Sequence, residues 1–297
     1  MTKLATPNFF IIGAPKSGTT AMSEYLRTHP NVFFSDPKEP QFFARDFHNK
    51  GAIRNLDEYL NLFSAAKPQH YVIAEGSTKY LRSEMAIQKI EEFSLDAHYL
   101  VMLRNPVDMA ISLHSQVLLN GDENEPDFEK AWRLQFERKN GRYIPLQCDE
   151  PMDLQYGYFC KIGEQVQRLF DIVERNRIKV IFFDDFRKNT RHAYDEVLDF
   201  LNLDIDDRKN FIIINERRTT VFRSIKYLTR VASRIKRAFG ISKRIGLIRF
   251  VNRLNSCQTE KPKLSASFNK ELRNYFYNDI RKLELVTGSD LSEWYST

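Results

Sequence analysis

A short loop that contains two glycines is the first segment of this chain whose residue types could bind an anion. The apolar run Phe9–Ile12 is followed by Gly-Ala-Pro-Lys-Ser-Gly-Thr-Thr, residues 13–20. Such a loop between a strand and a helix lets backbone N–H groups approach a phosphate-like group, and the helix end adds roughly half a positive charge. Thr19 stands where the Walker motif has its lysine, which disfavours an ATPase or a kinase. We therefore predict an anion site formed by Lys16, Ser17, Gly18, Thr19 and Thr20.

A second anion site is indicated by Arg104 and Ser112. Arg104 directly follows the apolar run Tyr99–Leu103, and Pro106 suits the first turn of a helix. Ser112 lies under two helical turns beyond Pro106 and can face the same side as Arg104. A guanidinium offers a fork of donors to a phosphate, and a serine hydroxyl can complete the site.

The pair Lys38-Glu39 precedes the aromatic pair Phe42-Phe43. From composition alone, a solvated turn is the simpler interpretation of these two charges. The functional alternative is a general base, because a carboxylate within about 3 Å of a hydroxyl or amine can take its proton.

The elements that position these residues alternate between short apolar runs and longer helical stretches. Continuous apolar runs are typical of strands buried on both faces, and their alternation with helices favours a parallel sheet. We predict strands at Phe9–Ile12, Tyr71–Ala74, Tyr99–Leu103 and Lys179–Phe183. We predict helices at Thr19–Thr28, Leu56–Phe63, Ser83–Phe93, Pro106–Asn120, Asp127–Lys139, Gly163–Asn176, Thr190–Leu201 and Phe268–Thr287.

The predicted fold is thus α/β, a P-loop-type three-layer sandwich in which helices flank a mainly parallel sheet. Ligands of such sheets bind beyond the carboxyl ends of the strands, where the two predicted anion sites lie. We see no repeat and no linker, and expect a single domain over residues 1–297.

Composition excludes several other classes of protein. The 23 Phe and 13 Tyr are too many for a disordered chain, and the three cysteines match neither a disulfide scaffold nor a zinc pattern. No apolar run reaches the roughly 7–15 residues of a signal peptide or the roughly 20 of a membrane span. We therefore expect a soluble, unexported protein located in the cytoplasm.

The positive charge is concentrated in one basic segment at about residues 222–254. Ten of the 45 Lys and Arg residues, and no Asp or Glu, lie between Arg223 and Arg253, and without them 35 basic residues face 39 acidic ones. A local patch indicates a local anionic partner and disfavours a nucleic-acid binder. Three interpretations are open: peripheral contact with an anionic membrane, a positive wall for an acidic ligand, or an amphipathic helix pair with a basic outer face.

The sequence Phe-Ile-Ile-Gly-Ala-Pro-Lys-Ser-Gly-Thr-Thr, residues 10–20, with Leu26 and His29-Pro30 after it, resembles the 5′-phosphosulfate loop of sulfotransferases. These enzymes use 3′-phosphoadenosine 5′-phosphosulfate (PAPS). The similarity is to the branch that includes heparan-sulfate sulfotransferases and their bacterial relatives, and it extends over nearly the whole chain. The resemblance implies that Arg104 and Ser112, eight residues apart, form the 3′-phosphate site.

The same resemblance gives roles to Lys38 and Glu39, and to two residues that follow the predicted strand Tyr71–Ala74. Glycan sulfotransferases have Lys-Glu-x-x-Phe-Phe where Lys38 and Glu39 stand, which implies that Glu39 is the general base and that Lys38 belongs to the catalytic group. Lys16 is suited to neutralise the bridging oxygen as the S–O bond breaks. Ser77 and Tyr80 match residues that line the acceptor cleft, although a capped turn explains them equally well.

The chain also departs from the family pattern. Gln41 replaces a frequent His, and Gly76 and Thr78 replace a Lys and a Pro. Cys257 has no partner for the disulfide loop that often closes the cofactor site. Lys263 could still reach the 3′-phosphate from this region, and a solvated loop is the alternative.

Taken together, the sequence predicts a sulfotransferase that moves the sulfuryl group from PAPS to a hydroxyl or amine of an acceptor, with 3′,5′-bisphosphoadenosine (PAP) as product and no metal. The expected acceptor is a carbohydrate, a glycolipid or a small natural product. Two alternatives stay open. One is a P-loop nucleotide kinase or NTPase, and the other is a non-catalytic, membrane-associated nucleotide-binding protein.

Overall fold

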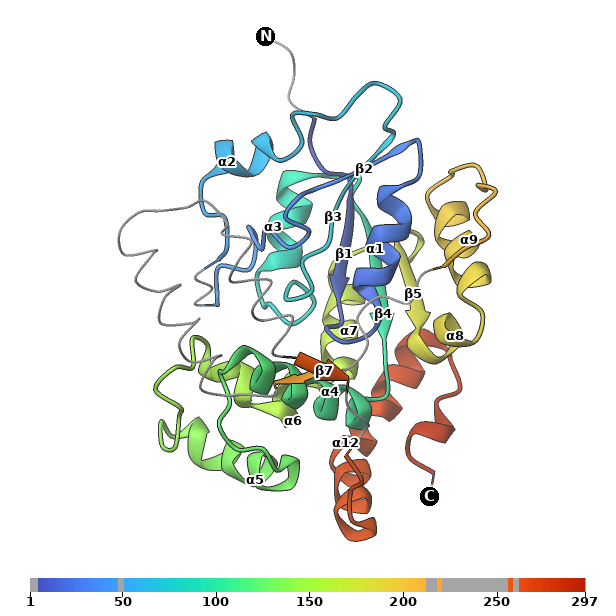
Figure 1. Cartoon of the computed structure of the whole chain (residues 1–297). Coiled ribbons are helices and arrows are strands. Elements are labelled where there is room, and N and C mark those ends of the chain that lie inside the picture. The colour runs from blue at the N-terminus through green and yellow to red at the C-terminus, as the bar shows by residue number, and fades with distance from the viewer. Residues whose placement is uncertain (1–4, 48–50, 212–217, 221–255, 259–261, 297) are drawn as a thin grey trace.

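The computed structural model describes residues 5–47, 51–211, 218–220, 256–258 and 262–296 (Figure 1). The predicted basic segment at about 222–254 lies outside these residues. All four predicted strands are confirmed, as β1 (Phe9–Gly13), β3 (Val72–Glu75), β4 (His98–Leu103) and β5 (Ile178–Phe182). A strand that was not predicted, β2 (Val32–Phe34), joins them at one edge.

The five strands form one parallel sheet in the order β2-β3-β1-β4-β5. β1 is the central strand and lies between β3 and β4. Its residues are apolar, as expected for a strand whose sheet is covered by helices on both faces. All five strands run in the same direction, so their carboxyl ends lie at the same end of the sheet. The α/β fold with a parallel sheet flanked by helices is therefore confirmed.

Alternate residues of the strands enter two separate cores. Phe10, Ile12, Tyr99 and Val101 face the larger core, whose other side is formed by α3 (Ala86–Phe93), α4 (Pro106–Asn120), α7 (Ile162–Ile172) and α12 (Ala266–Thr287). Phe9, Ile11, Leu100 and Met102 face the smaller core, which is covered by α1 (Thr19–Arg27), α8 (Phe183–Lys188) and α9 (Thr190–Phe200). The sheet thus separates two layers of helices (Figure 1).

The remaining elements surround these layers. They are α2 (Leu56–Asn61), α5 (Phe128–Lys139), α6 (Tyr156–Phe159) and three short 3₁₀ turns at Pro151–Leu154, Arg175–Arg177 and Ser292–Trp294. β6 (Arg218–Thr220) and β7 (Ser256–Gln258) pair antiparallel and lie beside α4 (Figure 1). Within the described residues, no helix is both long enough and apolar enough to cross a membrane.

Helices α7 and α12 pack very closely at one point. A Cβ atom on Gly163 would lie 2.0 Å from the backbone oxygen of Asp279, so only glycine allows this approach. The Asp279 carboxylate accepts hydrogen bonds from the backbone N–H groups of Gly163 and Glu164, at 2.8 and 2.9 Å. A side chain of α12 therefore caps the first turn of α7.

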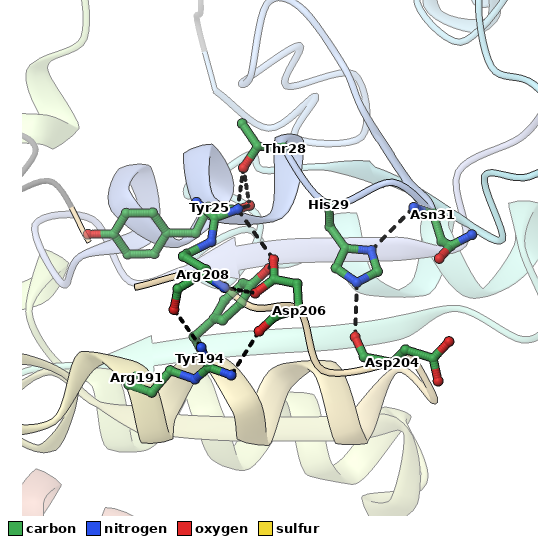
Figure 2. Close-up of polar contacts among 9 residues, drawn as sticks. All are labelled: Tyr25, Thr28, His29, Asn31, Arg191, Tyr194, Asp204, Asp206 and Arg208. Atoms are coloured by element: carbon green, nitrogen blue, oxygen red, sulfur yellow. Dashed lines mark hydrogen bonds and ion pairs between the residues drawn. The ribbon is translucent and has the colours of Figure 1, made fainter. Parts of the chain in front are cut away.

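A second polar network ties the segment after α9 to the end of α1 (Figure 2). Arg208 donates to the Tyr25 carbonyl at 3.0 Å and to the Thr28 hydroxyl, and its guanidinium lies 5.2 Å from the centre of the Tyr194 ring. Asp206 accepts from the Tyr194 hydroxyl at 2.9 Å. The carboxyl end of α1 is thereby held, since cations near the last carbonyls of a helix are stabilising.

Candidate active site

Four of the five strands, β1 to β4, are each followed at the carboxyl end by at least one residue of a single polar site. The loop after β1 contains Lys16, the segment after β2 contains Lys38 and Glu39, the turn after β3 contains Thr78, and Arg104 follows β4. This is the edge at which open parallel sheets bind ligands. Hydrogen bonds join Lys16 to Arg104, and Lys38 and Thr78 to Glu39.

The loop after β1 has the geometry of an anion site. Gly18 is the residue before α1 and has φ 89°, a conformation that glycine adopts at little cost. A Cβ atom at Gly18 would lie 3.1 Å from the Phe186 ring and 3.2 Å from the Phe183 ring. Gly18 has no side chain to cap α1, so the first N–H groups of this helix are suited to an external anion.

Lys16 lies inside the loop with φ 67°, a left-handed conformation that is costly for a residue with a side chain. Its Nζ atom donates to Gln116 Oε1 on α4 at 3.0 Å, and its backbone oxygen accepts from Arg104 Nη1 at 3.2 Å. Contacts on both sides therefore hold this conformation, and the Lys16 ammonium lies against Gln116 in the second half of α4.

Arg104 is fixed between three groups. Besides the Lys16 carbonyl, it forms an ion pair with Asp108 at 3.8 Å, and its guanidinium lies 4.7 Å from the centre of the Phe183 ring. Arg104 thus joins the loop after β1 to the carboxyl end of β4.

The segment of residues 35–43 follows β2 and lies against the same loop. Arg27 at the end of α1 donates to the carbonyls of Phe34 and Ser35 at 2.8 and 3.0 Å. Lys38 Nζ donates to Thr19 Oγ1 at 3.2 Å and lies 3.5 Å from Glu39 Oε1. A cation therefore bridges the candidate anion loop and the candidate base.

The Glu39 carboxylate has further partners and still reaches solvent. Thr78 Oγ1 donates to Glu39 Oε2 at 3.1 Å, and Gln41 Nε2 donates to the same oxygen at 3.3 Å. The Glu39 side chain is 33% exposed, so a reactant can approach it. Burial lowers the pKa of Lys38, and the adjacent Glu39 carboxylate partly restores it.

A second carboxylate, Glu75, lies behind this pair at the end of β3. It is fully buried and accepts hydrogen bonds from the hydroxyls of Ser77, Tyr80 and Tyr59 at 2.6, 2.7 and 3.1 Å. Burial raises the pKa of Glu75 to about 7, although the three hydroxyl donors act in the opposite direction.

The structure locates the other predicted site residues as follows. Ser77 and Tyr80 are 1% and 0% exposed and their hydroxyls face Glu75, so a direct contact with an acceptor stays a prediction. Ser112 is buried on α4, and Lys263 is exposed just before α12. Among the described residues, no hydrogen bond or ion pair joins Ser112 or Lys263 to the loop after β1, and their phosphate contacts stay predictions as well.

Three residues of the site were not predicted from the sequence: Glu75, Thr78 and Gln116. Gln116 lies four residues after Ser112 on α4, a spacing that places both side chains on one helix face and could have drawn attention to it. Thr78 was set aside as a departure from a family pattern, yet its hydroxyl contacts Glu39. In the part of the chain that the structure describes, no group of His, Cys, Asp and Glu residues could hold a metal ion.

Comparisons with known proteins show the family to which this chain belongs. The family model of the sulfotransferase domain matches residues 6–276. Heparan sulfate glucosamine 3-O-sulfotransferase 3A1 of Mus musculus is 30% identical over 166 residues, which are 56% of this chain and 39% of that protein. Carbohydrate sulfotransferase 15 of Homo sapiens is 26% identical over 252 residues, which span 66% of this chain and 44% of that protein.

Among solved structures, a sulfotransferase from Alicyclobacillus acidocaldarius superposes with a TM-score of 0.73 at 25% identity, covering 98% of this chain and 100% of that one. The chain spans about two fifths of the length of the two curated relatives. Because the family model covers most of the sequence, this chain belongs to the sulfotransferase family. The resemblance seen in the sequence is thereby confirmed, and the class of nucleotide kinases and NTPases is disfavoured.

Proposed function

We propose that this chain transfers the sulfuryl group of PAPS to a hydroxyl or amine of a carbohydrate acceptor. The loop of residues 13–20 would hold the 5′-phosphosulfate, and Arg104 with Ser112 would hold the 3′-phosphate. Glu39 would be the general base. The names of two relatives specify a heparan sulfate glucosamine and a carbohydrate, which supports a sugar acceptor for this chain, with a glycolipid or small natural product as the other acceptor classes.

The observation that carries the proposal is the bridge made by Lys38. Its ammonium lies 3.2 Å from the Thr19 hydroxyl on the anion loop and 3.5 Å from the Glu39 carboxylate. A sulfuryl donor on the loop would therefore lie beside both a cation and a proton acceptor. That pairing suits group transfer, since positioning and charge stabilisation provide most of the rate in reactions of this type.

The proposed reaction conserves atoms and charge. The acceptor oxygen or nitrogen forms a bond to sulfur while its proton passes to Glu39. The bond between sulfur and the bridging phosphate oxygen breaks in line, and that oxygen leaves with the electron pair as part of PAP. Lys16 and Lys38 would neutralise the charge that develops on the leaving oxygen.

The donor site is tested by calorimetric titration with PAP, ATP–Mg²⁺ and AMP. We expect PAP to bind more tightly than AMP, because only PAP has the 3′-phosphate, and we expect Arg104→Ala to remove most of that difference. A preference for ATP–Mg²⁺ would favour a kinase or NTPase instead. Binding of none of the three would refute the donor site.

The base is tested by transfer from ³⁵S-labelled PAPS to a panel of N-deacetylated heparan sulfate, desulfated heparan sulfate and glycolipids. We expect Glu39→Gln to reduce turnover by about 100-fold or more while PAP affinity stays within about twofold. Equal losses of turnover and PAP affinity would refute the assignment. Transfer to no acceptor, with binding to anionic vesicles intact, would favour the non-catalytic membrane-associated protein. The cytoplasmic location stays a prediction that fractionation of expressing cells can test.

A further inference from the structure

The buried carboxylate of Glu75 is the centre of a hydrogen-bond network that the proposed reaction does not use. Glu75 ends β3, has no exposed surface, and accepts from three hydroxyls. Tyr59 comes from α2, whereas Ser77 and Tyr80 belong to the turn that follows β3. A buried carboxylate with three donors has most of its acceptor sites occupied, and losing it would leave those donors unsatisfied.

Two of these hydroxyls also accept hydrogen bonds from the segment of residues 35–43. The backbone N–H of Gln41 donates to Ser77 Oγ at 2.9 Å, and the backbone N–H of Phe43 donates to the Tyr80 hydroxyl at 3.3 Å. Each hydroxyl therefore accepts a hydrogen bond from a backbone amide and donates one to the Glu75 carboxylate. These two amides lie two and four residues beyond Glu39.

The direction of these hydrogen bonds depends on the carboxylate. A hydroxyl has one proton to donate, and its oxygen lone pairs can accept from an amide while that proton has an acceptor elsewhere. Ser77 accepts from the amide of Gln41 in this way, and Tyr80 from the amide of Phe43. Glu75 is that acceptor for both Ser77 and Tyr80. Without it, both hydroxyls must find another partner or leave a proton unpaired, which weakens the amide contacts as well.

The same turn contacts the candidate base at two further points. The backbone N–H of Gly76 donates to the Lys38 carbonyl at 2.9 Å. The Thr78 hydroxyl donates to Glu39 Oε2 at 3.1 Å. Residues 76–80 therefore contact the segment of residues 35–43 on both sides of Glu39. The Glu75 carboxylate holds this turn through its hydrogen bonds with Ser77 and Tyr80.

We propose that Glu75 is a positioning residue of this active site, whose carboxylate holds Glu39 in place through the hydroxyls of Ser77 and Tyr80. The inference rests on the proposed function, because it takes Glu39 as the base. Glu75 itself would contact neither the donor nor the acceptor, since it is fully buried behind the segment.

The experiment measures hydrogen exchange at the amides of Gln41 and Phe43 by NMR in the full chain. Ser77→Ala removes the acceptor of the first amide, and Tyr80→Phe removes that of the second. We expect each to raise exchange at its own amide by about fivefold or more, the equivalent of one lost hydrogen bond. Glu75→Gln keeps one acceptor oxygen and replaces the other by an NH₂ donor, so it should raise exchange at one of the two amides. Amides of β4 should keep their exchange rates in all three variants, which separates a local effect from general destabilisation.

Tyr59→Phe is the matched control. It also removes one hydroxyl from Glu75, but no described hydrogen bond joins the Tyr59 hydroxyl to an amide of residues 35–43. Exchange at Gln41 and Phe43 should therefore stay within about twofold of the unaltered chain. Equal acceleration in Tyr59→Phe and Tyr80→Phe, or no acceleration in Glu75→Gln, would overturn the proposal.

Transfer kinetics separate this proposal from the proposed function. In Glu75→Gln we expect kcat to fall by about tenfold, because a misplaced base costs rate, while the Kd for PAP stays within about twofold. Faster exchange without any loss of kcat would overturn the catalytic role of the positioning. If Glu39→Gln keeps full turnover, the base assignment fails, and the exchange data still decide whether Glu75 holds the segment. The exchange measurement needs no acceptor.

Discussion

Replacing Glu75 by Gln should change how the stability of this protein depends on pH. The carboxylate is fully buried, and burial raises its pKa from 4.5 to about 7. The charged groups that face it are Lys38 and Glu39 from the segment after β2, with the hydroxyls of Tyr59 from α2 and of Tyr80 from the following turn. Glutamine has nearly the same shape but does not titrate.

The sign follows from proton linkage. A carboxyl with a raised pKa in the folded state binds more protons there than in the unfolded state between pH 4.5 and about 7. Its contribution to stability is fully present below pH 4.5 and is lost as the pH rises through about 7. A rise of the pKa from 4.5 to about 7 corresponds to roughly 3 kcal/mol, most of which is lost between pH 5 and pH 8.

Urea unfolding at pH 5 and pH 8 measures this effect. The unaltered chain should lose roughly 2 to 3 kcal/mol more unfolding free energy over that interval than Glu75→Gln. All other titrating groups contribute to both proteins, so they cancel in the difference. Equal pH dependence in the two proteins would refute the reasoning, because it would mean that Glu75 titrates alike in the folded and unfolded chain.

Three further changes test the donor site and its support. Arg104→Ala should weaken PAP binding by about 10- to 100-fold in calorimetry, since charge-assisted hydrogen bonds to a phosphate are lost, and an unchanged Kd would contradict the 3′-phosphate assignment. Gly18→Ala should lower the Tm by several degrees and weaken PAP binding, because φ 89° and the nearby rings of Phe183 and Phe186 leave little room for a methyl group. Arg208→Met should cost about 2 kcal/mol in urea unfolding by freeing the end of α1, yet leave PAP affinity unchanged; weaker PAP binding would show that the network in Figure 2 acts on the loop.

The strands were predictable where the sequence has continuous apolar runs, and not elsewhere. β1, β3, β4 and β5 are such runs, bounded by polar residues or by the loop glycine. β2 has three residues between two proline-containing turns, too few to show any pattern. α8 was not predicted, and Phe183, its first residue, was assigned to the preceding strand because it continues the apolar run of β5.

The site was predictable to the extent that strand topology determines it. Parallel strands bring their carboxyl ends to one edge, so Lys16 and Arg104 had to lie near each other, and the structure joins them by a hydrogen bond. The network around Glu75 could not be predicted in the same way. Its hydrogen bonds join the backbone amides of Gln41 and Phe43 to the hydroxyls of Ser77 and Tyr80, which lie nearly 40 positions further along the chain. No local pattern in the sequence indicates which groups these hydroxyls contact.

The two cores on opposite faces of the sheet divide the candidate site between them. The donor loop continues into α1, whose Ala21, Met22 and Tyr25 pack in the smaller core, whereas Tyr59 and Tyr80 beside the candidate base belong to the larger one. Substitutions that repack one core therefore leave the other largely undisturbed, since side chains couple strongly only where they touch. The loop after β1 and the segment that contains Glu39 can therefore be repacked separately, and the Lys38–Thr19 hydrogen bond is a direct contact between them that a repacked variant would have to keep.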